Sequence, residues 1–365
     1  MRLVKETLDP KRRIIMISDI HGEKDLLIKL LTKVDFNKED YLFLLGDYVG
    51  KGYNSLETLH YIMELSKQDN VYLIAGNCDL LFNSLYNEEE SIHKNEVPNL
   101  YDLFQHYHSL MEEMLDVLNI KITKDLDFKK VAPIIYENFK EELEFVRNLP
   151  RVIETEEFVF VHSAIKDDDY SLDTDFELMR TSEFVNKTNK RFKKYVVVGH
   201  YPTLNYCNKI PSLNSMINYR KNIICLDGGM NVIPYGQLNA LVYEKNVFTN
   251  YYVDKLDLYE IKKDNFPLNP NPLTINFENN EVEIIEEQDE FYKCFHPQSQ
   301  IFIDIDKDYI YKRDNHIYTN DTTNYELETN RGDIVHLIKK YKDKSFVKKS
   351  GIVGFIPNSC LGNKL

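Results

Sequence analysis

Short apolar runs alternate with amphipathic stretches over the first part of the chain. The runs at 14–17, 41–45 and 71–74 have the length and composition of buried strands. Between them, residues 23–34 and 55–65 carry apolar side chains at helical spacing. Strands that alternate with helices in this way predict parallel pairing and right-handed crossovers.

A side chain that can bind a metal follows each of five expected strands, two of which lie further along, at 158–161 and 195–198. In open α/β sheets, ligands bind outside the carboxyl ends of the strands. One such turn fits a solvated loop and a metal site about equally well, but five of them favour a single site. The side chains concerned are Asp19, His21, Asp47, Asn77, His162 and His200.

The first of these turns holds two candidate ligands. Asp19 and His21 are two residues apart, so they point to the same side if the chain stays extended. Gly22 then allows a sharp turn into the following helix. A carboxylate and an imidazole on one side suit a transition metal.

Residues 80–150 are expected to form a mostly helical insertion beside the site. Two amphipathic helices are expected there, at 99–120 and 127–148. The histidines of this insertion, His93, His106 and His108, are expected at the surface or at its boundary.

The pattern becomes strand-rich again after residue 161. Residues 176–185 look helical and contain Arg180, and strands of a second sheet are expected at 223–226 and 237–243. The prolines and acidic residues within 256–300 indicate a linker or added strands, and short strands are expected beyond them.

Composition narrows the classes of function. The 45 basic and 59 acidic residues give a formal net charge of −14, which argues against a general affinity for nucleic acid. The five cysteines are widely spaced and include no Cys-x-x-Cys pair, which argues against a disulfide framework or a structural zinc site. No stretch has the pattern of a signal peptide or the length of a membrane span, so we expect a cytoplasmic protein without a membrane partner.

Three short motifs carry a resemblance to a known family. Ser-Asp-Ile-His-Gly at 18–22, Gly-Asp-Tyr-Val-x-x-Gly at 46–52 and Gly-Asn-x-Asp at 76–79 are similar to the three blocks of the phosphoprotein (Ser/Thr) phosphatase family of metallophosphoesterases. Later segments, among them Val-Gly-His-Tyr-Pro-Thr at 198–203, resemble the bacterial branch of that family. The resemblance covers residues 12–252.

This resemblance implies an α/β fold, a two-sheet metallophosphoesterase sandwich flanked by helices. We expect that domain over 10–255, with the helical insertion at 80–150. Residues 256–300 would be a linker or added strands. Separately, Arg-Gly-Asp-Ile-Val-His-Leu-Ile at 331–338 and Gly-Ile-Val-Gly-Phe-Ile-Pro-Asn-Ser at 351–359 resemble the C-terminal half of an SH3 domain, so we expect 301–365 to form a small SH3-like β-barrel. The chain has no tryptophan, which argues against binding of proline-rich helices by the aromatic groove of such a domain.

The resemblance also implies a binuclear metal centre in which Asp47 bridges two ions. The ligands of the first ion would be Asp19, His21 and Asp47. The ligands of the second ion would be Asp47, Asn77, His162 and His200. We expect two divalent transition-metal ions, manganese ahead of iron or zinc. Such a pair neutralises a phosphoryl group and activates a water molecule for attack.

The chain departs from the family pattern at two places. The second block usually has Asp-Arg where this chain has Gly50-Lys51, and the third block usually has histidine where this chain has Cys78. In the family, that Asp–His pair protonates the leaving oxygen, so both members of the acid are absent here. Lys51 is a point charge that cannot make the bidentate contact of an arginine. Cys78 is either a small inert side chain or a reactive thiol.

The segment around Arg180 resembles the part of the bacterial branch in which an arginine meets the phosphate. We therefore expect Arg180, Lys51 and Cys78 to contact the substrate. Arg180 and Lys51 are also expected to act in catalysis together with Asp47.

These features predict a two-metal-dependent hydrolase of phosphoesters that resembles Ser/Thr protein phosphatases. A dinucleoside polyphosphate hydrolase and a phosphodiesterase are the enzymatic alternatives. A metal-binding scaffold whose SH3-like tail recruits a protein partner is the alternative from another class. The substrate would be a phosphoprotein or a nucleotide.

Overall fold

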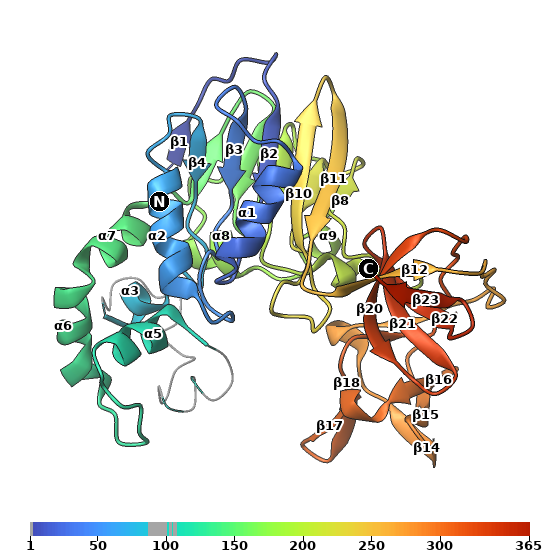
Figure 1. Cartoon of the computed structure of the whole chain (residues 1–365). Coiled ribbons are helices and arrows are strands. Elements are labelled where there is room, and N and C mark those ends of the chain that lie inside the picture. Colours follow the sequence, from blue (N-terminus) through green and yellow to red (C-terminus); the bar gives the residue numbers. More distant parts are fainter. Residues whose placement is uncertain (1–2, 87–100, 102–103, 105–107) are drawn as a thin grey trace. The chain divides into compact units, whose positions relative to one another are not determined.

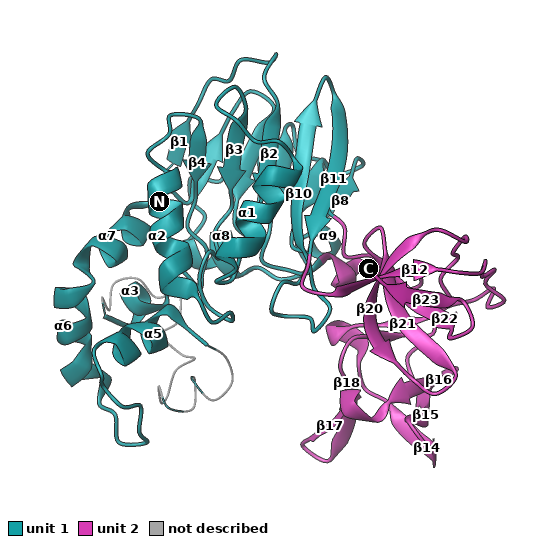
Figure 2. Ribbon diagram, viewed as in Figure 1, with its two compact units in different colours: residues 1–202, 215–253 teal, residues 203–214, 254–365 magenta. Residues whose placement is uncertain are grey.

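The computed structural model describes residues 3–86, 101, 104 and 108–365, so the expectations for His93 and His106 lie outside the described residues. The chain forms two compact units (Figures 1 and 2). The first unit comprises residues 1–202 and 215–253. The second unit comprises residues 203–214 and 254–365.

One sheet of the first unit holds the three strands of the βαβαβ pattern that the sequence predicts near the start of the chain. It contains β2 (Ile14–Ile17), β3 (Tyr41–Leu44), β4 (Val71–Leu73), β10 (Leu238–Glu244) and β11 (Val247–Val253). The strand order is β11-β10-β2-β3-β4, and β2, β3 and β4 pair in parallel. The expected parallel pairing is confirmed.

The other sheet of the first unit supplies the later strands. It contains β1 (Leu3–Lys5), β5 (Val152–Glu154), β6 (Phe158–Val161), β7 (Tyr195–Val198), β8 (Met216–Asn218) and β9 (Ile223–Cys225). The strand order is β1-β5-β6-β7-β9-β8, and β6, β7 and β9 are parallel. The expectation of 223–226 and 237–243 in one sheet was wrong, because β9 lies here and β10 lies in the other sheet.

Apolar side chains from the two sheets form one buried core. Met16 and Phe43 of the first sheet share a cluster with Phe160 and Val197 of the second. The rings of Phe43 and Phe160 stack with their centroids 3.9 Å apart. Helix α1 (Lys24–Lys33) contacts β10 and β11, and α2 (Ser55–Leu65) lies beside α1. The two-sheet sandwich flanked by helices is therefore confirmed (Figure 1).

The expected insertion is helical, but its helices differ from the expected ones. They are α3 (Leu81–Tyr86), α5 (Leu110–Val117), α6 (Phe128–Asn138) and α7 (Lys140–Asn148). Helix α5 begins after Ser109, whose side chain accepts a hydrogen bond from Glu112 N at 3.1 Å. The expectation of a single helix over 127–148 was wrong. Phe139 leaves the helical conformation, with φ −125° and ψ 32°, and so separates α6 from α7.

The segment that holds Arg180 is likewise divided. Helix α8 (Asp175–Arg180) ends at Thr181, which is extended, and α9 (Phe184–Lys187) begins after Glu183, which is left-handed with φ 56°. A continuous helix over 176–185 was therefore wrong. Arg180 is the last residue of α8.

The second unit contains a five-stranded sheet of order β22-β21-β20-β12-β23. Its strands are β12 (Asp257–Ile261), β20 (Ile334–Lys340), β21 (Lys344–Lys349), β22 (Ile352–Pro357) and β23 (Leu361–Lys364). All four pairings between neighbours are antiparallel. Ile261, Val335 and Val347 belong to its buried core.

The same unit has a second small core that includes Ile275, Cys294 and Ile305. Around it lie β13 (Thr274–Ile275), β14 (Glu283–Glu287), β15 (Phe291–His296), β16 (Ile301–Asp306), β17 (Ile310–Arg313), β18 (His316–Thr319) and β19 (Thr322–Thr323). Three short 3-10 helices complete it, at Thr203–Tyr206, Phe277–Asn279 and Lys307–Tyr309. The SH3-like tail and the boundaries at 255 and 300 stay predictions.

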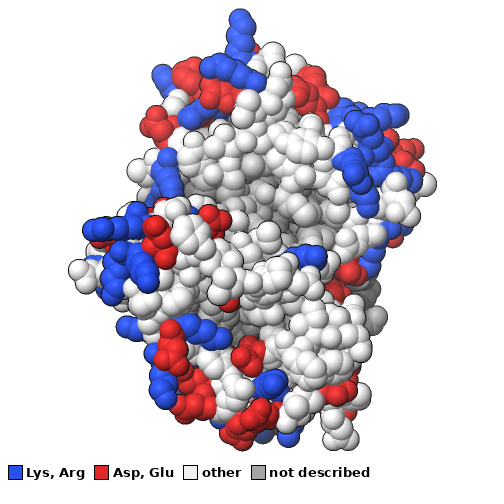
Figure 3. Space-filling view, turned by 90° about the vertical axis from the view of Figure 1, so that its right-hand side faces the viewer, with Lys and Arg blue, Asp and Glu red and all other residues white. Residues whose placement is uncertain are grey.

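Surface charge concerns the expectation about nucleic acid, and the length and apolar character of the helices concern the expectation about membranes. On the face drawn in Figure 3, basic and acidic side chains are interspersed, which does not give that face a single sign of charge. Among the described residues, none of the helices combines the length and the apolar character that crossing a membrane requires.

Candidate metal centre

The loops after β2 and β3 are held in unusual backbone conformations. Asp19, His21 and Asp47 have φ of 55°, 49° and 51°, and His200, after β7, has φ 66°. Left-handed conformations are uncommon for residues other than glycine and cluster at functional sites. The chain is therefore not extended between Asp19 and His21, and the alternation argument for their shared side was wrong. The turns nevertheless bring Asp19 Oδ1 within 3.8 Å of His21 Nε2.

Backbone hydrogen bonds tie these two loops together. Asp19 N donates to the Gly46 carbonyl at 3.1 Å, and His21 N donates to the Asp47 carbonyl at 3.0 Å. Gly22 N donates to the Tyr48 carbonyl at 2.8 Å. Each left-handed residue after β2 is thus fixed by the loop after β3.

The loops after β3 and β4 approach so closely that only glycine fits between them. A Cβ on Gly76 would lie 2.3 Å from both the backbone nitrogen and Oδ1 of Asp47. A Cβ on Gly46 would lie 2.3 Å from Gly76 N, and Gly46 also has φ 82°. This close approach places Asp47 directly against the Gly-Asn-x-Asp turn.

Asp79 organises this contact, a role that the sequence analysis did not assign. Its Oδ2 accepts hydrogen bonds from Asp47 N and Gly76 N, both at 2.8 Å. Its Oδ1 accepts from Tyr48 N at 2.8 Å and from Val49 N at 3.3 Å. Burial and the charge of Asp47 raise the pKa of Asp79 to about 7, and a cation at Asp47 would offset the second cause. The Asp at the end of the Gly-Asn-x-Asp motif was the available signal.

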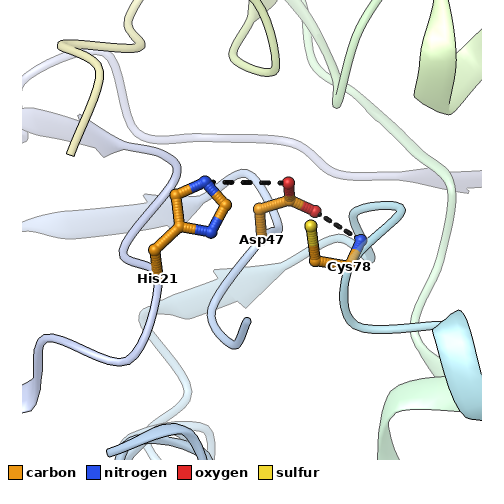
Figure 4. A group of neighbouring side chains, drawn as sticks. All are labelled: His21, Asp47 and Cys78. Atoms are coloured by element: carbon orange, nitrogen blue, oxygen red, sulfur yellow. Dashed lines mark hydrogen bonds and ion pairs between the residues drawn. The ribbon is translucent and has the colours of Figure 1, made fainter. Parts of the chain in front are cut away.

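Two groups of donor atoms meet at Asp47. His21, Asp47 and Cys78 form one group, shown in Figure 4, and Asp47, His162 and His200 form the other. Within each group the donor atoms all lie within 4.8 Å of one another. Among the described residues, Asp47 alone belongs to both groups, which is the arrangement expected of a bridging carboxylate.

Asp19 and Asn77 flank these groups. Both carboxylate oxygens of Asp19 accept from His200 N, at 3.2 and 3.0 Å, and Asp19 belongs to neither group. The Asn77 side-chain oxygen lies 3.2 Å from His162 Nε2 and 2.9 Å from His200 Nδ1. This arrangement fits a cation that is bound by the amide oxygen and the two ring nitrogens. It fits equally an amide turned by 180°, whose NH2 group would donate to both rings.

The charges of the site also fit a cation. Burial lowers the pKa of His21 and of His200 to about 3, so both imidazoles are neutral, the form that binds metals. Burial opposes a charge on His162, but Asp47, 3.4 Å away, raises the pKa of His162 to about 10. Burial raises the pKa of Asp19 to about 6. A divalent ion would compensate these crowded carboxylates.

Two buried polar atoms at the centre have no hydrogen-bond partner among the described residues. They are Nε2 of His21 and Oδ2 of Asp227. Asp227 follows β9, and burial followed by the charge of Asp19 raises its pKa well above the usual range. Both atoms are electron-pair donors, so the described residues fit the divalent ions that the motifs imply.

Two cationic side chains stand at the edge of the centre. Lys51 is half-buried; burial opposes its charge, but negative groups around it, Cys78 and Asp47 first, raise its pKa. Burial is the first cause of the lowered pKa of His200, and the charges of His162, Lys51 and Arg180 add to it in that order. The contact of Lys51 and Arg180 with a phosphate stays a prediction.

A pocket of about 520 Å³ opens next to this edge, and its lining includes Tyr53, His108 and Glu112. The rings of Tyr53 and His108 lie with centroids 3.9 Å apart, and Tyr53 is 72% exposed. The His108 carbonyl accepts a hydrogen bond from Lys51 N at 2.6 Å. The sequence analysis missed this pair, because the two aromatic residues come from different loops.

The sequence over residues 12–236 matches the family model of the calcineurin-like phosphoesterases. The chain belongs to this family. Calcineurin-like phosphoesterases bind divalent metal ions, and the donor groups of the described residues fit such ions. The resemblance drawn from the three motifs is confirmed.

Individual relatives of this calcineurin-like phosphoesterase match over short segments. A symmetrical bis(5'-nucleosyl)-tetraphosphatase from Klebsiella pneumoniae is 47% identical over 66 residues, 18% of this chain and 23% of the relative. Its counterpart from Buchnera aphidicola is 39% identical over 89 residues, 24% of this chain and 31% of the relative. The chain thus spans less than a third of either relative.

Solved structures show more extended but distant likeness. A cold-active protein-tyrosine phosphatase from Shewanella covers 70% of this chain and 82% of its own, with 15% identity and a TM-score of 0.45. A protein serine/threonine phosphatase from Saccharomyces cerevisiae covers 70% and 84%, with 11% identity and a TM-score of 0.41.

Replacing Asp79 by asparagine should destabilise the first unit. Asp79→Asn puts an NH2 group in place of an oxygen that accepts two backbone N–H groups. Leaving such buried donors unsatisfied costs about 1–3 kcal/mol. Urea unfolding of the metal-free protein should show this loss, and Asp25→Asn, an exposed carboxylate in α1, should show almost none. Equal stability of the two variants would contradict the role of Asp79.

Proposed function

We propose that this protein is a two-metal hydrolase that prefers phosphoanhydrides and phosphoesters with acidic leaving groups, with dinucleoside polyphosphates as the first substrate class. Asp19, His21 and Asp47 are proposed to hold one ion, and Asp47, Asn77, His162 and His200 the other. Manganese is the first metal to test, followed by iron and zinc. When bound, the ions would supply charge neutralisation and an activated water.

The cationic side chains at the edge of the centre are proposed to hold the phosphoryl group. Lys51 offers a single positive charge beside Asp47 and Cys78. Arg180 offers a planar fork that can grip two phosphate oxygens. Together they would orient the phosphorus atom towards the donor groups and offset the charge that the transferred group carries.

The observation that carries the preference for acidic leaving groups is the pair Gly50 and Cys78. A Cβ on Gly50 would lie 3.3 Å from Cys78 Cβ, so these residues are neighbours in space. Gly50 has no side chain to orient an acid, and burial raises the pKa of the Cys78 thiol well above its usual range. The positions that bear the acid in the family therefore offer no efficient proton donor here.

The pocket beside Lys51 supports a nucleotide substrate. Tyr53 and His108 present two rings, in contact at an interplanar angle of 47°, at a cavity of about 520 Å³, which falls in the size range of small-molecule sites. A nucleobase stacks on aromatic side chains with a contribution of about 1–3 kcal/mol. Lys51 N binds the His108 carbonyl, which ties the pocket to the edge of the centre. The names of the tetraphosphatase relatives agree with this substrate class.

Phosphoprotein hydrolysis, which the family resemblance placed first, becomes the second candidate. Phosphoserine releases an alkoxide, which needs a proton more than a nucleoside phosphate or a phenolate does. A general acid contributes about 10²–10⁴-fold to such a step. The Gly50 and Cys78 pair is therefore expected to penalise phosphoserine most.

Rates should depend steeply on the acidity of the leaving group. We expect aryl phosphates of graded pKa to give a steep linear free-energy plot, and diadenosine tetraphosphate to be hydrolysed about 10²–10⁴-fold faster than a phosphoserine peptide. The measurement is kcat/KM for each substrate with manganese-loaded protein. A flat plot with brisk phosphoserine turnover would contradict the proposal and would point to a proton donor such as His108, whose Nδ1 lies 3.0 Å from Glu112.

Arg180→Ala should reduce kcat/KM by about 10- to 150-fold, the value of one charge-assisted contact, and leave the metal content unchanged. Arg180→Lys should recover only part of the rate, because an ammonium cannot grip two oxygens. Arg147→Ala is the matched control, since Arg147 also lies in the last turn of a helix and pairs with Glu144. Unchanged kinetics in Arg180→Ala would show that the arginine does not meet the phosphate.

A further inference from the structure

Cys78 stands among the donor atoms of the centre. One donor atom each from His21, Asp47 and Cys78 lies within 4.8 Å of the others, and Figure 4 shows the sulfur beside the Asp47 carboxylate. In tetrahedral coordination, bond lengths of about 2.0–2.3 Å place two donors of one zinc ion roughly 3.3–3.8 Å apart. The His21 Nε2 and Asp47 Oδ2 atoms, 3.9 Å apart, are close to this separation, and the Cys78 donor lies within reach of the same ion.

His21 gives an independent sign of a ligand at this place. Its side chain is 1% exposed, and Nε2 has no hydrogen-bond partner among the described residues. Nδ1 lies 3.4 Å from the Val49 carbonyl, which favours the tautomer that leaves the Nε2 lone pair free. Nε2 lies 3.9 Å from Asp47 Oδ2. Two electron-pair donors that face each other without a proton between them fit a cation.

Gly50 leaves room for the side chain of Cys78 at this place. A side chain on Gly50 would press on Cys78, since its Cβ would lie 3.8 Å from Sγ and 3.3 Å from Cys78 Cβ. A divalent ion bound there would stabilise the thiolate form, because coordination deprotonates a thiol outright.

We propose that Cys78 is a ligand of the metal position formed with His21 and Asp47, and that it binds as a thiolate after releasing its proton to water. This inference rests on the proposed two-metal function and replaces the substrate contact expected for Cys78. A thiolate is a soft donor, so this position would favour zinc or ferrous iron over manganese. The other proposed metal position has no sulfur donor, so it should not prefer zinc or ferrous iron over manganese. Its ligands are Asp47, Asn77, His162 and His200.

Cobalt substitution of the full-length protein tests the sulfur ligand directly. Wild-type protein loaded with Co²⁺ should show a thiolate-to-cobalt charge-transfer band in the near ultraviolet. Cys78→Ser should lose this band, whereas Cys207→Ser should keep it. Cys207 is the matched control because it is also half-buried, and its Sγ lies 3.7 Å from the carbonyls of Thr203 and Ser212.

Two further measurements keep the test independent of the folding of one variant. In wild-type protein, Zn²⁺ should protect one thiol from a thiol reagent, and this thiol should map to Cys78 by peptide analysis. The preference for zinc over manganese should fall in Cys78→Ser and Cys78→Ala by at least about 10- to 100-fold, the loss that removal of even an outer partner of a ligand causes.

The outcomes separate this inference from the proposed function. Metal bound by wild-type protein without the charge-transfer band, or a band that survives in Cys78→Ser, would overturn the thiolate ligand and leave the two-metal hydrolase intact. Failure of wild-type protein to bind any divalent ion would overturn both. A band that is lost only on changing Cys78, together with protection of that thiol by zinc, would support the ligand.

Discussion

The buried carboxylate of Asp47 is the interaction on which the rest of the centre depends. Its Oδ1 accepts from Cys78 N at 2.8 Å and lies 3.4 Å from His162, and its Oδ2 lies 3.9 Å from His21. It therefore joins loops that follow β2, β3, β4 and β6. Taking a carboxylate out of water costs several kcal/mol unless other charges compensate it. The fold gathers the neutral imidazoles of His21 and His200 and further carboxylates around it, and the proposed pair of cations would balance that set.

The sandwich accepts local strain to hold this carboxylate in place. Stacking of Phe43 on Phe160 fixes the two sheets against each other, so the loops at their ends have little freedom. Asp19, His21 and Asp47 then take left-handed conformations, which the hydrogen bonds between their loops maintain. Such strain is typical of sites in which geometry is fixed before a ligand binds. The proposed loss of the family acid at Gly50 and Cys78 would change the chemistry without changing this frame.

From the sequence, the helices and strands and the candidate ligands could be predicted well. The local geometry of the turns that hold these ligands could not. Apolar runs placed β2, β6 and β7 at their observed bounds, because burial on both faces leaves a continuous apolar signal. The helical spacing of apolar residues placed α2 at its observed bounds. The Asp19 and His21 conformations could not be predicted, since they depend on bonds to Gly46 and Asp47, 27 and 26 residues further along the chain. The break at Phe139 and the different sheets of β9 and β10 likewise depend on packing. The Tyr53 and His108 pair brings together residues 55 apart, for which periodicity gives no signal.

Metal stoichiometry of wild-type protein and Asp47→Asn tests the central claim most directly. Elemental analysis after manganese loading and desalting should find two ions per wild-type chain. Asp47→Asn should lose most of both ions while keeping its circular dichroism spectrum, because the amide keeps the shape of the side chain and removes the charge that both positions share. Wild-type protein without bound metal, or an Asp47→Asn variant that retains two ions, would contradict a centre built on this carboxylate.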